Sequence, residues 1–203
     1  MAVAELERVL AAVDAALRQT FPHDFDTRCM YAAFGVRDLL RAAGERAQII
    51  AGDFLCFSVS RDGRSALMEG FGKMDANPPA HFWVEAAGRR LDLGPHYLPR
   101  RSRMEVAAIP PVCWSLGSPL PHYARYRERQ RFDFDVELSP ADPLVERLRE
   151  FRSICAQQPA ASPHWRWMLR SQGSVTAAAR DGDTWAKNAL LFLKCTTVGQ
   201  LPI

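Results

Sequence analysis

The stretch HFWVEAAGRRLD, residues 81–92, decides the fold. Two segments in which apolar side chains recur, 80–86 and 89–93, flank the dipeptide Ala87-Gly88. A short turn that contains glycine between two such segments is typical of a β-hairpin. We therefore predict two antiparallel strands here, and their pairing determines which side chains share a face of the sheet.

The centre of this turn fixes the pairing of the two strands. His81 comes to lie opposite Gly94, and Asp92 becomes its diagonal neighbour on the same face. Diagonal neighbours have backbones about 7–8 Å apart, which still allows an imidazole and a carboxylate to meet. The sequence therefore predicts that Asp92 orients the side chain of His81.

Two amphipathic helices are predicted before the hairpin, over residues 5–21 and 29–43, because apolar residues recur there at helical spacing. Asp26 or Thr27 is the expected N-terminal cap of the second helix, because either side chain can accept a hydrogen bond from the first turn. Cys29 therefore lies in the first turn of this helix.

The sequence pattern of the remaining residues predicts further strands, followed by helices. Alternation of apolar and polar residues predicts strands over 46–51 and 53–59 with a bulge at Gly52, over 65–71, and most clearly over 132–138. Residues 94–121 are rich in proline and show no clear period. After Ser139, helices are expected to begin near Asp142 and Ser162 and to span 185–193.

These elements predict an α+β fold. The chain has 203 residues, of which 48% are hydrophobic and 24% charged, and this composition is typical of a globular protein with one sizeable domain. We predict a core domain over 1–140 and a helical C-terminal extension over 141–203 that packs on it.

Cys29, His81 and Asp92 have the residue types of a nucleophilic triad. A thiol becomes a good nucleophile near neutral pH when nearby positive charge favours the thiolate, and both a helix N-terminus and an imidazolium supply such charge. A carboxylate beside the imidazole fixes its tautomer and stabilises the imidazolium. We therefore predict Cys29 as the nucleophile, His81 as the base and acid, and Asp92 as the residue that orients His81.

These residues resemble the transglutaminase-like superfamily, whose members are related to papain-like cysteine enzymes. The resemblance covers about residues 24–95 and depends on RCMYAAF at 28–34, AQIIAG at 47–52, HFWVE at 81–85 and Leu91-Asp92. It implies a Cys-His-Asp triad and a central helix packed on an antiparallel sheet. The chain is also similar to the transglutaminase-like enzymes that cleave leader peptides in bacterial peptide maturation.

The resemblance implies acyl transfer, or hydrolysis of an amide or peptide bond, through a thioester and without a metal or organic cofactor. Trp83 and His96 are expected to contact the peptide or amide substrate. Gln19 lies on another helix, so we expect the backbone N–H of Cys29 to stabilise the oxyanion together with a second donor that the sequence does not identify. The alternative is an inactive member of the same fold that binds a peptide or a protein.

The positive charge of the chain is concentrated in residues 100–131. This segment holds seven arginines and two glutamates, whereas the whole chain has a formal net charge of +3. An acidic partner, a nucleic acid or a substrate carboxylate would bind such a segment, but arginines that cover apolar surface at a solvated edge also explain it. We favour the solvated edge, and nucleic-acid binding is the weaker hypothesis.

The cysteines and the N-terminus indicate the cellular compartment. The five cysteines are far apart and form no CxxC pair, which argues against a disulfide framework and against a zinc knuckle. No apolar run reaches the roughly 18–20 residues that cross a bilayer, and Glu5 and Glu7 lie where a secretory signal is uncharged. We therefore expect a cytoplasmic protein with no membrane partner.

Overall fold

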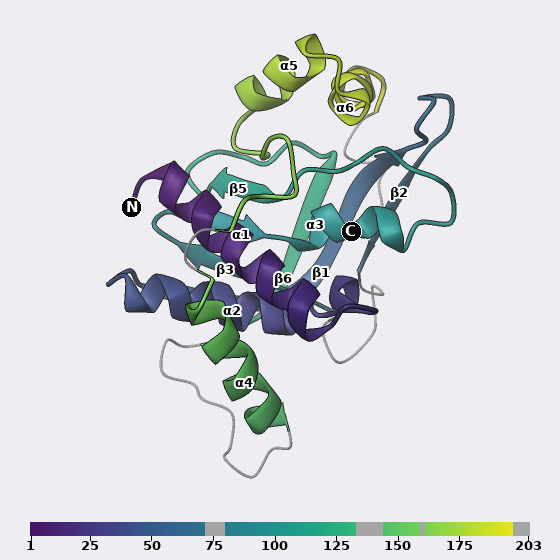
Figure 1. Ribbon diagram of the computed structural model, residues 1–203. Helices are drawn as coiled ribbons and strands as arrows, with labels where there is room; N and C mark the ends of the chain where they lie inside the picture. Colours follow the sequence, from purple (N-terminus) through teal and green to yellow (C-terminus); the bar gives the residue numbers. More distant parts are fainter. Residues whose placement is uncertain (72–79, 133–143, 159–160, 197–203) are drawn as a thin grey trace.

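The computed structural model describes residues 1–71, 80–132, 144–158 and 161–196. The helices are α1 (Val3–Thr20), α2 (Cys29–Ala42), α3 (Gly94–Tyr97), α4 (Leu144–Ala156), α5 (Gln172–Arg180) and α6 (Thr184–Cys195), with 3-10 helices η1 (Phe25–Thr27) and η2 (Leu98–Arg100). The strands are β1 (Ala47–Val59), β2 (Ala66–Phe71), β3 (His81–Ala86), β4 (Arg89–Asp92), β5 (Val112–Ser115) and β6 (Ala124–Arg131). The predicted α+β class is confirmed (Figure 1).

The long strand β1 organises the antiparallel sheet. Its first half pairs with β3 and its second half pairs with β2, while β6 runs along the opposite edge. The end of β2 and the start of β3 therefore meet beside the middle of β1, where Phe54 pairs with Phe71 and Gly52 pairs with His81. This junction is where the candidate site forms.

The middle of β1 carries the predicted bulge. The pairing with β6 shifts between Ala51 and Gly52. A Cβ atom at Gly52 would lie 2.0 Å from the carbonyl oxygen of Arg127, so only glycine allows β6 to approach this closely. The bulge bends the sheet beside His81.

The hairpin between β3 and β4 has the predicted pairing. Val84 lies opposite Leu91 and Ala86 lies opposite Arg89. The two turn residues both have positive φ, 49° at Ala87 and 69° at Gly88, as a type I′ hairpin turn requires. The pairing predicted from the sequence is therefore confirmed.

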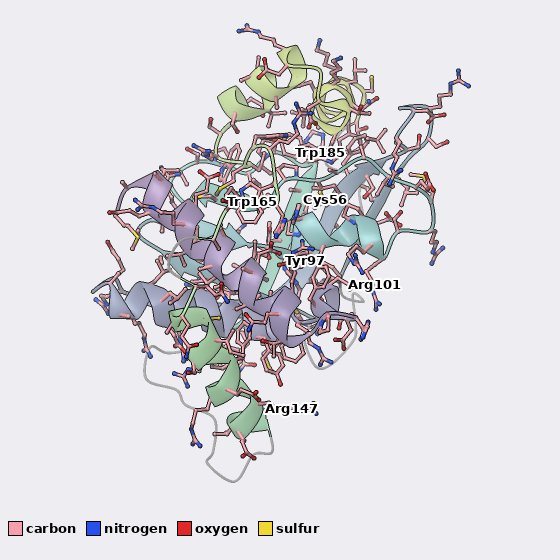
Figure 2. The ribbon with its side chains drawn as sticks, in the orientation of Figure 1. Cys56, Tyr97, Arg101, Arg147, Trp165 and Trp185 are labelled. Atoms are coloured by element: carbon pink, nitrogen blue, oxygen red, sulfur yellow. The ribbon has the colours of Figure 1, made fainter. Side chains whose placement is uncertain are left out.

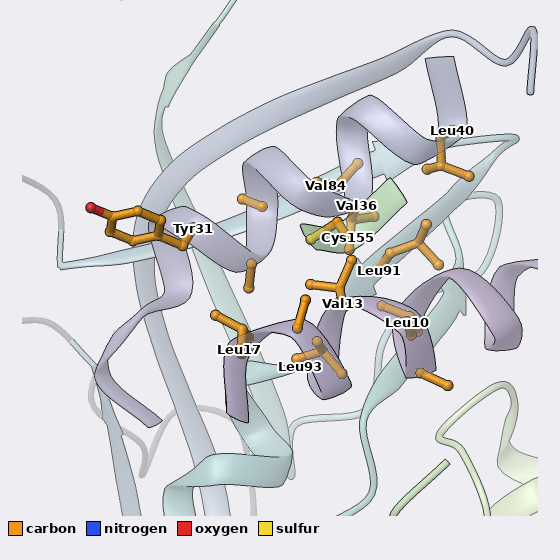
Figure 3. Close-up of a cluster of buried hydrophobic side chains, with 14 of the residues drawn as sticks. Leu10, Val13, Leu17, Tyr31, Val36, Leu40, Val84, Leu91, Leu93 and Cys155 are labelled. Atoms are coloured by element: carbon orange, nitrogen blue, oxygen red, sulfur yellow. The ribbon is translucent and has the colours of Figure 1, made fainter. Parts of the chain in front are cut away.

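Helices α1, α2 and α4 pack against one another and against the hairpin (Figure 3). The buried side chains that meet there include Leu10, Val13 and Leu17 of α1, Val36 and Leu40 of α2, Val84, Leu91 and Cys155. This core holds the N-terminal end of α2 against the start of β3. None of the helices in the described ranges is long and apolar enough to span a bilayer.

A second core lies around α5 and α6, at the other end of the molecule from α2 and α4 (Figure 1). Trp185 of α6 is fully buried, and its indole donates a hydrogen bond of 2.7 Å to the carbonyl oxygen of Phe57. This contact attaches the C-terminal helices to the second half of β1.

Several sequence predictions are wrong. No strand was predicted for β5 or β6, because β5 is short and β6 is dominated by arginines. The helix expected near Ser162 does not form: the next helix begins at Gln172 and is capped by Ser171, which satisfies the first-turn amide of Ser174. Most of the strand predicted over 132–138 lies outside the described residues.

The predicted cap of α2 is also wrong. Arg28 occupies the cap position, and no side chain caps this helix among the described residues. Asp26 is instead buried in η1, where its carboxylate lies 3.5 Å from Arg100 and 3.7 Å from Arg101. The first-turn amides of α2 are therefore left without a capping side chain.

Candidate active site

His81 and Asp92 form the centre of the candidate site. The Nε2 atom of His81 lies 2.7 Å from Oδ2 of Asp92, and both side chains are buried. Because the hairpin pairing makes them diagonal neighbours, the predicted contact between them is present.

Asp92 is held from three directions. Besides His81, the hydroxyl of Tyr126 donates a hydrogen bond of 2.7 Å to Oδ2, and the backbone N–H of Gly94 donates one of 2.7 Å to Oδ1. A buried carboxylate needs such donors, because an ion without partners is costly to bury. Its orientation is therefore fixed by β3, β6 and the start of α3.

The backbone at Gly94 packs directly against the side chains of His81 and Asp92. A Cβ atom there would lie 2.3 Å from Cε1 of His81 and 3.1 Å from Oδ1 of Asp92. The first distance is far below any van der Waals contact, so a larger residue would displace the imidazole. Gly94 is consequently part of the support of the site.

Aromatic rings enclose the imidazole of His81. Phe71 stacks on it with ring centroids 5.1 Å apart, Phe54 lies at 5.4 Å and Trp83 at 6.0 Å. These rings exclude water from the imidazole, whose residue has an exposed fraction of 0%. Interactions with Asp92 are stronger in this apolar setting than they would be in water.

The pKa of His81 is raised by its charged neighbour. Burial by itself lowers the pKa of this imidazole, but the charge and hydrogen bond of Asp92 oppose this, and interactions with Cys29 add to the effect. Together they raise the pKa of His81 to about 10. The site therefore favours an imidazolium near neutral pH.

Cys29 is the first residue of α2 and is half-buried. Its Sγ atom lies 3.9 Å from the carbonyl oxygen of Ala80, the residue that precedes His81. Within the described part of the chain, Nδ1 of His81 is buried and has no hydrogen-bond partner, although Cys29 is close enough to affect the pKa of this imidazole. Asp92 contacts Nε2 of His81, so Nδ1 is the ring nitrogen that can interact with the thiol of Cys29.

The other cysteines have different surroundings, although all five are free thiols. Burial raises the pKa of Cys56, Cys113 and Cys155, which keeps these side chains protonated. Cys195 is exposed near the end of α6. Cys29 is thus the partly accessible cysteine that lies beside an imidazole.

The two residues predicted to contact substrate make other contacts in the structure. Trp83 has an exposed fraction of 1% and packs between His81 and Tyr126, so it supports the site and forms no wall of an open groove. The Nδ1 atom of His96 lies 3.0 Å from the carbonyl oxygen of Ile109, and the imidazole packs on Trp165 with ring centroids 5.6 Å apart. Contact of either residue with a substrate stays a prediction.

Sequence reasoning missed Tyr126. It belongs to a strand that was not predicted, and it lies within the basic segment 100–131. A signal was present, because Tyr126 is an aromatic residue that alternates with arginines in ARYRERQR, as residues with one buried face do. Only the pairing of β6 with β1 reveals that it reaches Asp92.

The basic segment divides into two groups in space. On β6, Arg127 lies 2.6 Å from the buried carboxylate of Asp53 and Arg131 lies 2.9 Å from Glu85. These arginines form ion pairs along a sheet edge. The other group, Arg100, Arg101 and Arg103, follows α3, and two of its members lie close to Asp26.

A hollow of about 740 Å³ shares lining residues with the surroundings of His81 and Cys29. Its lining includes Glu69, Phe71, Ala80, Leu98, Arg101 and Arg103. Two of them connect it to the site, because Phe71 stacks on His81 and the Ala80 carbonyl oxygen faces the thiol of Cys29. In the part of the chain that the structure describes, no group of three or more His, Cys, Asp or Glu side chains is placed to hold a metal ion.

Comparisons with known proteins give the fold and no activity. No family model matches the chain, and no curated protein matches it. The chain is similar to the crystal structure of the genomics target APC5867, with a TM-score of 0.50, 15% sequence identity, and coverage of 80% of this chain and 82% of that one. At this identity the similarity concerns the fold alone.

Proposed function

We propose that this protein is a cysteine-dependent acyltransferase or amide hydrolase of the papain-like, transglutaminase-like kind. One observation carries the proposal: Asp92 holds Nε2 of His81 at 2.7 Å, and the other ring nitrogen is left toward the thiol at the start of α2. This is the arrangement of nucleophile, base and orienting group that thiol catalysis needs.

The first step forms a thioester. In the reactive form of the site, Nδ1 of His81 already holds the proton, and the sulfur of Cys29 attacks the carbonyl carbon of an amide as a thiolate. The C–N bond then breaks while His81 gives the proton to the leaving nitrogen, which departs as an amine. The raised pKa of His81 supports this order, because the imidazole retains the proton until the leaving group takes it.

The second step releases the acyl group. Water or a second amine attacks the thioester carbonyl, and His81 accepts a proton from that nucleophile. The proton returns to sulfur as the C–S bond breaks. The products are a carboxylic acid or a new amide, and the Cys29 thiol is restored.

The N-terminus of α2 supplies the donors for the oxyanion. Its first-turn amides lack a capping side chain among the described residues, and the positive end of the helix dipole is directed at the same place. The side-chain oxygen of Gln19, on α1, accepts a hydrogen bond of 2.7 Å from Gln158. We therefore assign the oxyanion to the backbone N–H of Cys29.

Tyr126 acts through Asp92 and is a positioning residue. Its hydroxyl is bonded to the same carboxylate oxygen as His81, so it fixes the angle at which Asp92 meets the imidazole. Burial, together with the charge of Asp92, raises the pKa of Tyr126 well above its usual value, which keeps the hydroxyl protonated as a donor.

An activated ester tests this proposal. The protein is incubated with p-nitrophenyl acetate, and the sites of acetylation are mapped by peptide mass spectrometry. We expect an acetyl thioester on Cys29 that is released over time by water or by an added amine, and no such turnover in Cys29→Ser. Cys195→Ser is the matched control, because it removes an exposed thiol away from His81.

Two outcomes contradict the proposal. In the first, acetylation spreads over the exposed cysteines and lysines with no preference for Cys29. In the second, Cys29→Ser hydrolyses the ester as fast as the unmodified protein. Either result indicates an inactive member of the fold, which would bind a peptide or protein without chemistry.

A further inference from the structure

The hollow lined by Phe71 and Ala80 is placed to hold the acyl part of a substrate. Phe71 forms a wall of the hollow and stacks on His81, while Ala80 forms its rim and faces the sulfur. A group bound in the hollow therefore lies next to two residues that contact His81 and Cys29. The chemistry of the lining then selects the substrate.

Two arginines, Arg101 and Arg103, line the hollow. Arg101 points outward from the short helices that follow β4 (Figure 2), and Arg103 is exposed nearby. Arg101 lies 3.7 Å from Asp26, but it shares that single carboxylate with Arg100. Arg103 forms no ion pair within the described ranges.

Glu69 also lines the hollow and lies on the same face of β2 as Phe71. One carboxylate oxygen accepts a hydrogen bond of 3.3 Å from the backbone N–H of Arg103. The other oxygen, Oε2, is buried and has no hydrogen-bond partner among the described residues. An unpaired buried acceptor is costly, and an N–H group of a substrate would satisfy it.

We propose that the acyl part of the substrate carries a carboxylate, as in a glutamyl or aspartyl peptide. The carboxylate binds Arg101 and Arg103, a backbone N–H of the same peptide donates to Glu69, and the methylene groups pack on Leu98 and Phe71. This inference rests on the proposed function, because it assigns the specificity of the same site.

The charge of the lining fits one carboxylate better than a polyanion. Arg100, Arg101 and Arg103 face Asp26 and Glu69, which leaves a single positive charge in the group. A phosphate chain would bring several negative charges toward Glu69, and like charges at close range repel. A peptide with one acidic side chain meets no such conflict.

The test uses two reagents that differ in charge and share their shape. Acetyl-Ala-Glu vinyl sulfone and acetyl-Ala-Gln vinyl sulfone both alkylate a reactive thiol, and the rate of modification of Cys29 is measured by mass spectrometry. We expect the glutamyl reagent to react about tenfold faster, which is the effect of one charge-assisted contact at a partly exposed site. Raising the salt concentration should reduce this preference.

Arg103→Gln should reduce the preference to about twofold or less, because it removes one of the two guanidinium partners. Arg64→Gln is the matched control: it removes an exposed arginine from the turn between β1 and β2, outside the hollow, and should retain the tenfold preference. Iodoacetamide, which is small and neutral, should label Cys29 at the same rate in all three proteins.

The outcomes separate this inference from the proposed function. If iodoacetamide labels Cys29 rapidly and the two vinyl sulfones react equally, the specificity is wrong and the proposed function stands. The same holds if Arg64→Gln lowers the preference as much as Arg103→Gln. If Cys29 reacts no faster than the other cysteines with any reagent, both proposals fail.

Discussion

The hydroxyl of Tyr126 donates a hydrogen bond of 2.7 Å to Oδ2 of Asp92, and the same oxygen lies 2.7 Å from Nε2 of His81. The carboxylate is thus held between a residue of β6 and a residue of β3, with β1 between the two strands. The orientation of His81 therefore depends on both strands that pair with β1 here, β3 and β6. The site is also sensitive to a hydroxyl group that never approaches the sulfur.

Tyr126→Phe should slow alkylation of Cys29 by iodoacetamide several-fold at neutral pH, because Asp92 loses a donor that fixes its orientation. The free energy of unfolding should also fall by roughly 1.5–3 kcal/mol, the range for a hydrogen bond to a charged group. Alkylation is followed by mass spectrometry and unfolding by urea titration.

Tyr123→Phe is the matched control for this variant. It also removes a buried hydroxyl, one that donates to Gln172 at 3.3 Å rather than to Asp92. It should lower stability by about 1 kcal/mol and leave the alkylation rate unchanged. Equal alkylation rates in Tyr126→Phe and Tyr123→Phe would show that Tyr126 has only a structural role.

Asp92→Asn should lower the pKa of His81 strongly. Burial lowers the pKa of this imidazole, and the charge of Asp92 is the main interaction that opposes it. Without that charge the pKa should fall from about 10 to below the ordinary value for histidine. NMR titration of the histidine ring signals measures this directly.

His96 provides an internal reference for the same titration. Burial lowers its pKa, and its ring bonds to Ile109 rather than to Asp92. Its signals should therefore titrate in the same range in Asp92→Asn as in the unmodified protein. A His81 pKa that stays near 10 in Asp92→Asn contradicts the account of the site.

The stability of the protein should fall as the pH rises from about 6.5 toward 10. Unfolded His81 loses its proton near pH 6.5, whereas the folded side chain keeps it up to about pH 10. In this window the folded state binds more protons than the unfolded state, so the free energy of unfolding decreases with pH. Below pH 6.5 the full contribution of the imidazolium is present.

Urea titrations at pH 6.5, 8 and 9.5 test this dependence. His81→Gln, which cannot titrate, should show a flatter profile over the same range. Tyr97 and Tyr126 do not confuse the comparison, because burial raises the pKa of both phenols well above the ordinary value. Parallel profiles for the two proteins would contradict a raised pKa of His81.

Gly94→Ala adds a single methyl group, but it should displace the imidazole of His81. The added Cβ would lie 2.3 Å from Cε1 of His81, so the imidazole must move. We expect a loss of roughly 1–3 kcal/mol of stability, as for other overpacked sites, together with slower alkylation of Cys29.

Gly117→Ala is the control for this substitution, because the nearest atom to its Cβ would be 3.8 Å away, an ordinary contact. It should leave both stability and alkylation nearly unchanged. If Gly94→Ala behaves like Gly117→Ala, the close approach of Gly94 to His81 is not present in the protein.

The hairpin and the start of α2 could be predicted because their signals are local. The turn at Ala87-Gly88 fixes the pairing of β3 with β4 within a few residues, and that pairing brings His81 to Asp92. The apolar spacing before it likewise predicted that Cys29 begins a helix. Local patterns of this kind need no knowledge of the remaining fold.

The rest of the site depends on contacts between distant segments. Tyr126 is 34 residues from Asp92 along the chain, and its strand is rich in arginines that bond to Asp53 and Glu85 across the sheet. The cap predicted for α2 failed because Asp26 turns instead toward arginines that follow β4. The position of β6 and the cap of α2 depend on ion pairs between distant segments, which the sequence pattern does not reveal.

The central claim is that Cys29 is activated by His81, and competitive alkylation of the five cysteines measures it most directly. The native protein is treated with limiting iodoacetamide at pH 7, and each cysteine is quantified by mass spectrometry. The account predicts that Cys29 is modified at least tenfold faster than exposed Cys195, and that Asp92→Asn removes most of this difference. If Cys29 is modified no faster than Cys195 in the native protein, the account is wrong.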